Sequence, residues 1–248
     1  MSSTKAQVWF AEPDAITDSG VLARYRDLLS DDERVRCDRF VFDKDRHHFL
    51  VAHALVRTVV GQAVDRDPAS LGFDLGVHGR PELRTSGGPP PVRFNLSHTS
   101  GLVAVAVTSG LDIGVDVERL RDVNPGVAEK HFAAQEVRAL EALPESGRRP
   151  RFFAYWTLKE SYIKARGMGL ALPLGGFAFD LDADPGRIGF SVRDDLDDRA
   201  DAWRFVLWSA GPEHRAALAV RARELHWTTR RCVPLVNETE WSWDVLAY

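Results

Sequence analysis

Hydrophobic residues recur along the chain with two different spacings, which predict alternating helices and strands. Between Asp43 and Gly61 the apolar positions fall three and four residues apart, so we predict a long helix that Asp43 caps and Gly61 ends. Before it, Ser30 and Glu33 have the spacing of a capping box, in which each side chain bonds a free backbone N–H group. The pair Asp67-Pro68 predicts the start of a short third helix.

Strand-type patterns follow in the middle of the chain. The segment 84–91, RTSGGPPP, contains three consecutive prolines and cannot form a central strand. Beyond it we predict strands at 92–96, 102–108 and 111–118. In the last of these, the alternation places three apolar residues on one face and the carboxylates of Asp116 and Glu118 on the other.

The second half of the chain repeats this order. After a turn at 124–126 we predict two helices and then four strands; the helices cover 127–142 and 151–166, and the strands 177–181, 188–192, 203–209 and 216–220. The repetition predicts an α+β protein built as a pseudo-duplicate, each half a small, mostly antiparallel sheet with a long helix. The predicted halves are 1–110 and 111–248, and the second includes an aromatic tail from Leu225 that we expect to pack back on the body.

Composition and charge narrow the functional class. Of the 248 residues 44% are apolar, which is too many for a disordered chain. The 32 basic and 36 acidic side chains give a net charge of −4, unlike the basic field of a nucleic-acid-coating protein. Two cysteines are too few for a disulfide scaffold or a zinc site. With no signal-type segment at the N-terminus and no apolar run long enough for a bilayer, we expect a cytoplasmic protein without nucleic-acid or membrane partners.

Three carboxylates form the first candidate site. Asp116 and Glu118 lie two residues apart on a predicted strand, so they project side by side from one face, and we expect the Asp116 carboxylate to face solvent. Glu160 on a predicted helix completes the set. Neighbouring carboxylates repel each other unless a cation lies between them, and oxygen ligands alone favour a hard ion such as Mg²⁺. The alternative is an ordinary solvated strand face.

The helix around Glu160 adds a cation. Glu160 and Lys164 are four residues apart on one helix face, where they form either a surface ion pair or a base and a phosphate-binding ammonium group. Ser97 and His98 lie at the end of a predicted strand, where they either bind phosphate oxygens or belong to an ordinary turn. A Ser–His nucleophile pair is disfavoured, because neighbouring residues of a strand point to opposite faces and no G-x-S-x-G motif is present. Further arginines, each of them a phosphate ligand or a solvated charge, are Arg34, Arg36, Arg39 and Arg80.

Taken in order, these segments resemble the 4′-phosphopantetheinyl transferases, specifically their larger, pseudo-dimeric surfactin-type group. Four segments carry the resemblance: HGRPEL (78–83), FNLSHT (94–99), IGVDVE (113–118) and FFAYWTLKESYIKARGMGL (152–170). Each segment is unspecific alone, whereas their combination is highly specific. The likeness covers most of residues 30–174.

The resemblance implies transfer of the phosphopantetheine arm of coenzyme A to a serine of an apo acyl or peptidyl carrier protein, with release of adenosine 3′,5′-bisphosphate. It implies Mg²⁺, or alternatively Mn²⁺, on Asp116, Glu118 and Glu160. From the chemistry of the step we expect Glu160, or a water molecule that it orients, to act as the base, and His98 and Lys164 to neutralise charge. The residues it assigns to coenzyme A are Arg36, Gly79, Arg80, Pro81, Ser97, His98, Lys159 and Lys164.

The chain departs from the family pattern at three positions. Glu33 and His48 stand where basic residues are expected, and Phe49 replaces a small polar residue. We therefore expect the 3′-phosphate of coenzyme A to rely on Arg36, Arg39 or Arg80.

For docking of the carrier protein we predict a local patch, made of Arg119, Arg121 and Phe132. We expect a monomer. Two other functions stay open on the sequence: a Mg²⁺-dependent hydrolase of nucleotide pyrophosphates, and a non-catalytic module that binds coenzyme A or a carrier protein.

Overall fold

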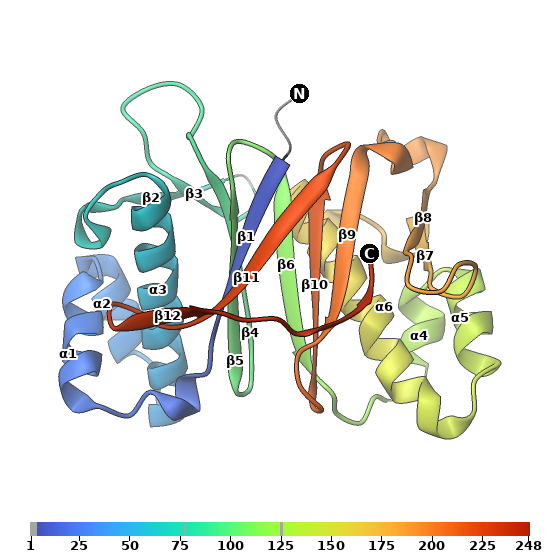
Figure 1. Cartoon of the computed structure of the whole chain (residues 1–248), viewed down its shortest axis with the longest axis horizontal. Helices are drawn as coiled ribbons and strands as arrows, with labels where there is room; N and C mark the ends of the chain where they lie inside the picture. Colours follow the sequence, from blue (N-terminus) through green and yellow to red (C-terminus); the bar gives the residue numbers. More distant parts are fainter. Residues whose placement is uncertain (1–3, 77, 125) are drawn as a thin grey trace. The chain divides into compact units, whose positions relative to one another are not determined.

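A computed structural model of the chain describes residues 4–76, 78–124 and 126–248. The chain forms two compact units (Figure 1). Unit 1 contains the described residues up to Leu111 together with His226–Ser242, and unit 2 contains Asp112–Leu225 and Trp243–Tyr248. Each unit packs a long helix on an antiparallel sheet, which confirms the predicted α+β, pseudo-duplicated architecture. None of the helices in the described parts of the chain is long and apolar enough to cross a membrane.

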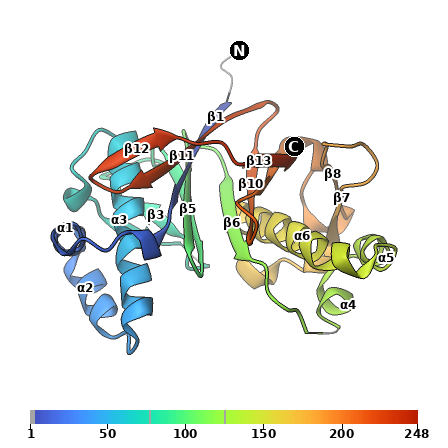
Figure 2. The same cartoon turned by 60° about the horizontal axis from the view of Figure 1, so that its bottom comes forward.

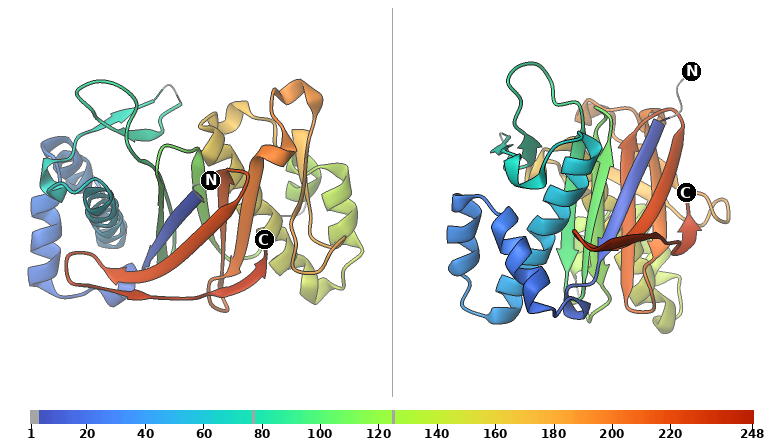
Figure 3. Two further views of the ribbon diagram at one scale, coloured as in Figure 1. Left: turned by 45° about the horizontal axis from the view of Figure 1, so that its top comes forward. Right: turned by 60° about the vertical axis from the view of Figure 1, so that its left-hand side comes forward.

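Unit 1 is built on a five-stranded sheet with the strand order β12-β11-β1-β5-β4. Its helices are α1 (Ser19–Leu28), α2 (Asp31–Asp38) and α3 (Asp43–Ala63); its strands are β1 (Thr4–Ala11), β4 (Arg93–Thr99), β5 (Leu102–Thr108), β11 (Leu225–Val233) and β12 (Asn237–Glu240), and β2 (Phe73–Leu75) and β3 (Pro81–Leu83) form a separate pair. Helix α3 lies along the sheet (Figure 3) and buries Val51, Leu55 and Val59, one from each successive turn, against it.

The helix starts predicted in unit 1 are mostly confirmed. Ser30 and Glu33 form the capping box at the start of α2, and Asp67 accepts a hydrogen bond from the backbone of Ala69 at the start of a short 3-10 helix. Helix α3 differs at both ends: Phe42 is its N-cap, and it continues past Gly61 for two residues. A glycine in a helix costs only about 1 kcal/mol relative to alanine, so the packing of α3 outweighs it.

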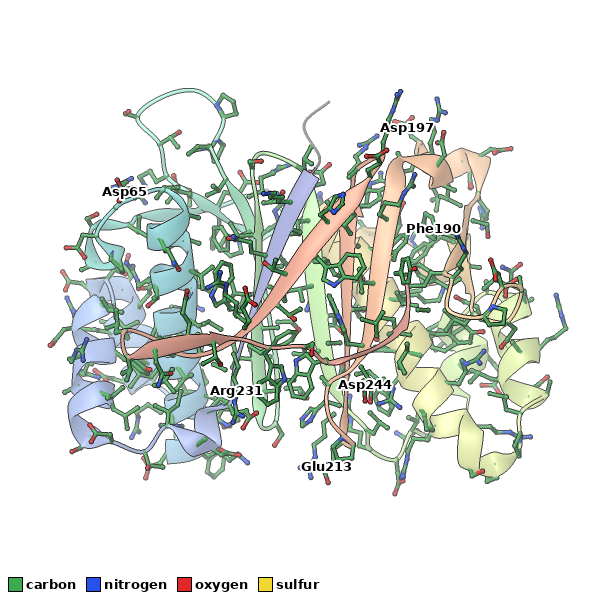
Figure 4. All side chains as sticks on the ribbon, viewed as in Figure 1. Asp65, Phe190, Asp197, Glu213, Arg231 and Asp244 are labelled. Carbon is green, nitrogen blue, oxygen red and sulfur yellow. The ribbon has the colours of Figure 1, made fainter. Side chains whose placement is uncertain are left out.

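Unit 2 is built on a four-stranded sheet with the order β13-β9-β10-β6. Its helices are α4 (Val127–His131), α5 (Ala134–Glu141) and α6 (Glu145–Arg166); its strands are β6 (Ile113–Arg119), β9 (Trp203–Ser209), β10 (His214–Arg221) and β13 (Asp244–Ala247), with β7 (Phe177–Asp180) and β8 (Gly189–Val192) as a separate pair. The core is aromatic: the ring of Phe190, labelled in Figure 4, lies 5.0 Å from that of Tyr162 and 4.8 Å from that of Phe205.

Two helix predictions in unit 2 need correction. The helix predicted at 127–142 is broken into α4 and α5, because Phe132 is extended and turns its ring into the core. The helix predicted from 151 begins at Glu145 and includes Pro150, although a proline usually marks a helix boundary. The turn predicted at 124–126 contains residue 125, which lies outside the described residues.

The sequence analysis placed the whole aromatic tail in the second half, and this is wrong for most of its residues. Residues 226–242 join unit 1, where β11 pairs with β12 and lies beside β1 (Figure 2). Only the last strand, β13, pairs with β9 in unit 2. The physical reason is that β1, a strand absent from the sequence prediction, has an edge whose backbone groups β11 satisfies.

Candidate active site

The carboxylates lie where helix α6 crosses strand β6 at very close range. A Cβ atom added to Gly114 of β6 would come within 2.0 Å of the Ser161 carbonyl oxygen and 2.4 Å of the Ala165 backbone nitrogen. Only glycine permits this approach, because any side chain would push the helix away from the strand. Gly114 thereby brings Glu160 and Lys164 of α6 next to the polar residues of β6, a role that sequence reasoning missed.

Asp116 pairs directly with Lys164 across this contact. The Lys164 Nζ atom donates a hydrogen bond to the Asp116 Oδ1 atom at 2.7 Å. Asp116 is only 4% exposed, so the prediction that its carboxylate faces solvent is wrong. The helix covers it because Gly114, two residues earlier on the same face of β6, allows α6 to come so near.

Glu160 lies within electrostatic range of both strand carboxylates. Burial, which disfavours the charged form, raises the pKa of Glu160 above its usual range. The negative charges of Asp116 and Glu118 raise this pKa further, while the Lys164 ammonium group opposes the rise. Three acidic groups that influence each other in this way are frequent at functional sites, because the cost of crowding like charges needs a compensating role.

All three side chains offer carboxylate oxygens, which are the ligands that a hard divalent cation prefers. Two of the three, however, already pair with cations of the protein. Asp116 pairs with Lys164, and Glu118 accepts a hydrogen bond at 2.7 Å from the Nη1 atom of Arg121. Within the described part of the chain, no three His, Cys, Asp or Glu side chains form a group arranged to hold a metal. A metal at this site would have to take the place of those ammonium and guanidinium contacts.

Lys159, one residue before Glu160, belongs to a closed internal network instead. Its Nζ atom lies 2.8 Å from the Glu136 Oε2 atom, with both side chains 0% exposed, and it donates to the carbonyl oxygens of Leu174 and Phe177. The second Glu136 oxygen accepts the backbone N–H of Phe179. The assignment of Lys159 to coenzyme A therefore needs correction: its ammonium group is fully used inside the core. Its partner is Glu136 of helix α5.

Unit 1 holds a separate basic pocket of about 660 Å³. The predicted residues Arg36, Arg39 and His98 line it together, and Lys44 and His48 of α3 add further nitrogen donors. Lys44 and His48 are one helical turn apart, a spacing that marks one face of α3 and could have suggested this role. Phe40, Phe49 and Leu96 supply apolar surface, so the pocket suits a ligand that combines an anionic group with a flat or apolar body.

The departures at Glu33 and Phe49 have structural explanations. Glu33 accepts a hydrogen bond from Arg57 Nε at 2.9 Å, and the Arg57 side chain is 2% exposed, so Glu33 pairs a buried guanidinium group of α3. Phe49 stacks on His53 with ring centroids 3.7 Å apart, and the Arg36 guanidinium group lies 5.5 Å from the Phe49 ring. Burial lowers the pKa of His53, which also lines the pocket.

The remaining predicted residues do not gather in this pocket. Ser97 is buried and points to the opposite face of β4 from His98, as strand geometry requires. Gly79 has a positive φ in the turn between β2 and β3, and Pro81 begins β3. Arg80 lies 3.4 Å from Glu82.

The predicted docking patch is only partly available. Phe132 is 6% exposed and packs on Phe152, so its placement on the surface is wrong. Arg119 stays exposed at the end of β6 and pairs at 3.0 Å with Glu213, which Figure 4 labels.

Two family models match the chain. The family model described as 4′-phosphopantetheinyl transferase superfamily matches residues 112–220, and that described as 4′-phosphopantetheinyl transferase, N-terminal, matches residues 19–110.

Among curated relatives, a 4′-phosphopantetheinyl transferase of Bacillus subtilis is 32% identical over 166 residues, covering 67% of this chain and 72% of the relative. The transferase Sfp of Bacillus subtilis strain 168 is 30% identical, covering 69% and 74%. The transferase HetI of a Nostoc species is 35% identical, covering 58% and 61%. The chain therefore belongs to the 4′-phosphopantetheinyl transferase superfamily.

Proposed function

We propose that this enzyme transfers the 4′-phosphopantetheine arm of coenzyme A to a serine of an apo acyl or peptidyl carrier protein. The observation that carries the proposal is the position of Glu160 beside Asp116 and Glu118 on the closely packed α6–β6 pair. Together with membership of the family, this arrangement supplies a base, a cation in Lys164 and oxygen ligands within one unit.

In the proposed reaction the serine oxygen forms a bond to the phosphorus that carries the pantetheine arm. The bond from that phosphorus to the bridging pyrophosphate oxygen breaks, and adenosine 3′,5′-bisphosphate leaves with the electron pair. Glu160, or a water molecule that it orients, takes the hydroxyl proton of the serine. Lys164 holds positive charge next to the phosphate oxygens on which negative charge develops.

Asp116, Glu118 and Glu160 are the residues that we propose to hold Mg²⁺, with Mn²⁺ as the alternative. When bound, the ion would neutralise pyrophosphate charge. For this binding Lys164 and Arg121 have to release Asp116 and Glu118. Lys164 would then be available for the substrate, which links metal binding to phosphate binding through one side chain.

We assign the 3′-phosphate and adenine end of coenzyme A to the basic pocket of unit 1. Arg36 and Arg39 are exposed there and able to form charge-assisted hydrogen bonds, and His98 supplies another donor from β4. Phe49 offers an aromatic face that suits a purine ring. Lys44 and His48 join the candidates that the sequence had suggested.

The decisive experiment is incubation with coenzyme A, Mg²⁺ and an apo carrier protein, followed by intact mass of the carrier. We expect a gain of one phosphopantetheine, abolished by EDTA and restored by Mg²⁺ or Mn²⁺. Glu160→Gln serves as the matched variant, because it keeps the shape of the side chain and removes its charge. Cleavage of coenzyme A without a carrier would instead favour a pyrophosphate hydrolase, and binding without turnover a non-catalytic module. A monomeric, cytoplasmic enzyme remains a prediction that light scattering and fractionation would test.

A further inference from the structure

Unit 2 contains a cavity of about 330 Å³ on the side of its sheet that faces α6. It lies between the first half of α6, the end of β7, the middle of the sheet and the C-terminal strand β13. None of Asp116, Glu118, Glu160 or Lys164 lines it. Its walls are mainly apolar, and they include Leu143, Ala154, Leu181, Leu207, Leu246 and Ala247.

One strong cation faces this apolar cavity, the guanidinium group of Arg215 on β10. The Arg215 Nη1 atom donates only to uncharged groups, the Ser209 hydroxyl at 3.3 Å and the His214 carbonyl at 3.0 Å. Among the described residues no carboxylate lies within 4.0 Å of it; Glu118, directly opposite in the strand register, is paired with Arg121 instead. Burial lowers the pKa of Arg215, and no acidic neighbour opposes this shift.

A second arginine on the same cavity shows the contrast. Arg151 of α6 also lines the cavity, but its Nη1 atom donates to both oxygens of Asp182 at 2.8 Å. Arg151 is therefore neutralised by a carboxylate, whereas Arg215 has no carboxylate partner within 4.0 Å among the described residues. An uncompensated, half-buried charge is costly, so its position in an apolar cavity calls for an anion from outside.

We propose that this cavity binds a small aliphatic monocarboxylate, with its carboxylate on Arg215 and its hydrocarbon body against the leucine walls. The planar guanidinium fork matches a carboxylate in geometry. Arg215 is the one lining cation that is not paired with a carboxylate in the described part of the chain, and this disfavours a phosphate dianion, which needs more donors than the cavity offers. The volume equals that of roughly ten waters, enough for an acid of six to eight carbons.

The test is an NMR and calorimetric titration of the full chain with hexanoate, with hexanamide as the uncharged analogue. We expect hexanoate to bind below about 10 mM and to shift the backbone amides of Gly147, Leu207 and Leu246, and hexanamide to bind at least tenfold more weakly. Arg215→Met should weaken hexanoate binding by about 10- to 100-fold, the usual worth of a charged hydrogen bond. Arg223→Met, an exposed arginine outside the cavity, is the matched control and should bind like the parent.

A second variant keeps the proposal testable if Arg215→Met fails to fold. Leu246 is 43% exposed, so Leu246→Asp should fold, and its negative charge at the cavity should exclude hexanoate. The proposal is overturned if hexanoate and hexanamide bind equally, if Leu246→Asp binds as the parent does, or if no binding occurs up to about 10 mM. Since none of these measurements uses transferase activity, their outcome is independent of the proposed function.

Discussion

The two units place a long helix on an antiparallel sheet, yet they hold charge of opposite sign. Helix α3 of unit 1 carries a closed ion pair, Arg57 with Glu33, and contributes Lys44 and His48 to a pocket rich in cations. Helix α6 of unit 2 carries a closed pair, Lys159 with Glu136, and contributes Glu160 to a group of carboxylates.

In both units a long helix carries two kinds of charged side chain, one kind paired inside the protein and one kind gathered with like charges. In each closed pair, Arg57 with Glu33 and Lys159 with Glu136, the two largely buried side chains neutralise each other. Their charged groups are therefore not available to bind a ligand. We call the other two groups open clusters: Arg36, Arg39, Lys44 and His48 in unit 1, and Asp116, Glu118 and Glu160 in unit 2. Each keeps like charges close together, which costs free energy. In unit 2 this cost is partly offset by Lys164 and Arg121, which pair with Asp116 and Glu118.

The largest expected effect comes from a change in the open cluster of unit 2. Glu160→Gln should lower kcat by about 10²- to 10⁴-fold, the usual worth of a positioned base, while coenzyme A still binds. The melting temperature should not fall, since burial of the Glu160 charge is unfavourable. Steady-state kinetics and a melting curve measure both effects. Parental turnover in this variant would refute the assignment of Glu160 as the base.

The closed pair of unit 2 should behave in the opposite way. Lys159→Met leaves the Glu136 charge buried without its partner, so we expect a loss of about 3–5 kcal/mol in the free energy of unfolding. The double variant Lys159→Met with Glu136→Leu should recover part of this loss. Arg149→Met, which removes the exposed ion pair between α6 and Asp122, is the control and should cost less than about 1 kcal/mol. Urea denaturation compares the three variants; equal losses for Lys159→Met and Arg149→Met would contradict the distinction between buried and exposed pairs.

The open cluster of unit 1 should affect binding more than chemistry. Replacing Arg36 and Arg39 one at a time with Gln should raise KM for coenzyme A by about 10- to 100-fold each, with kcat nearly unchanged. Removal of the 3′-phosphate from the substrate should abolish the difference between parent and variant, because the lost contact is then absent from both. Arg34→Gln is the matched control, since Arg34 pairs with Asp31 and does not line the pocket. If Arg34→Gln raised KM as much, the pocket assignment would fail.

The sequence predicted what depends on local pattern. The capping box of Ser30 and Glu33 and the strand at Asp116 follow from spacing. The sequence also singled out Arg36, Arg39 and His98, but their meeting in one pocket is seen only in the structure. What it missed depends on contacts distant along the chain. That Lys159 is buried and Lys164 is not depends on Glu136, which lies on another helix, and no local signal distinguishes the two lysines.

A second limit concerns edges and close approaches. The tail after Leu225 has a strand-like pattern, but only the free edge of β1 decides which sheet it joins. The pattern around Gly114 predicts an ordinary strand whatever residue stands at that position. The need for glycine becomes clear only from the close approach of α6 in the structure.

The smallest expected effect concerns the charge state of the unit 1 pocket. Burial lowers the pKa of His53, so the folded protein favours its neutral form at pH values where an exposed histidine, with a pKa of about 6.5, is half protonated. A lowered folded pKa means that the unfolded chain binds the proton more tightly. The contribution of His53 to stability is therefore present above pH 6.5 and is lost as the pH falls through the folded pKa. The unfolding free energy of His53→Phe should decline less between about pH 7 and pH 5 than that of the parent.

NMR titration should place the midpoint of His53 protonation below 6.5. Coenzyme A should raise this midpoint, because a phosphate in the pocket stabilises the imidazolium form. A midpoint that does not move with saturating coenzyme A would show that the phosphate binds elsewhere, and would remove the main difference between the two units.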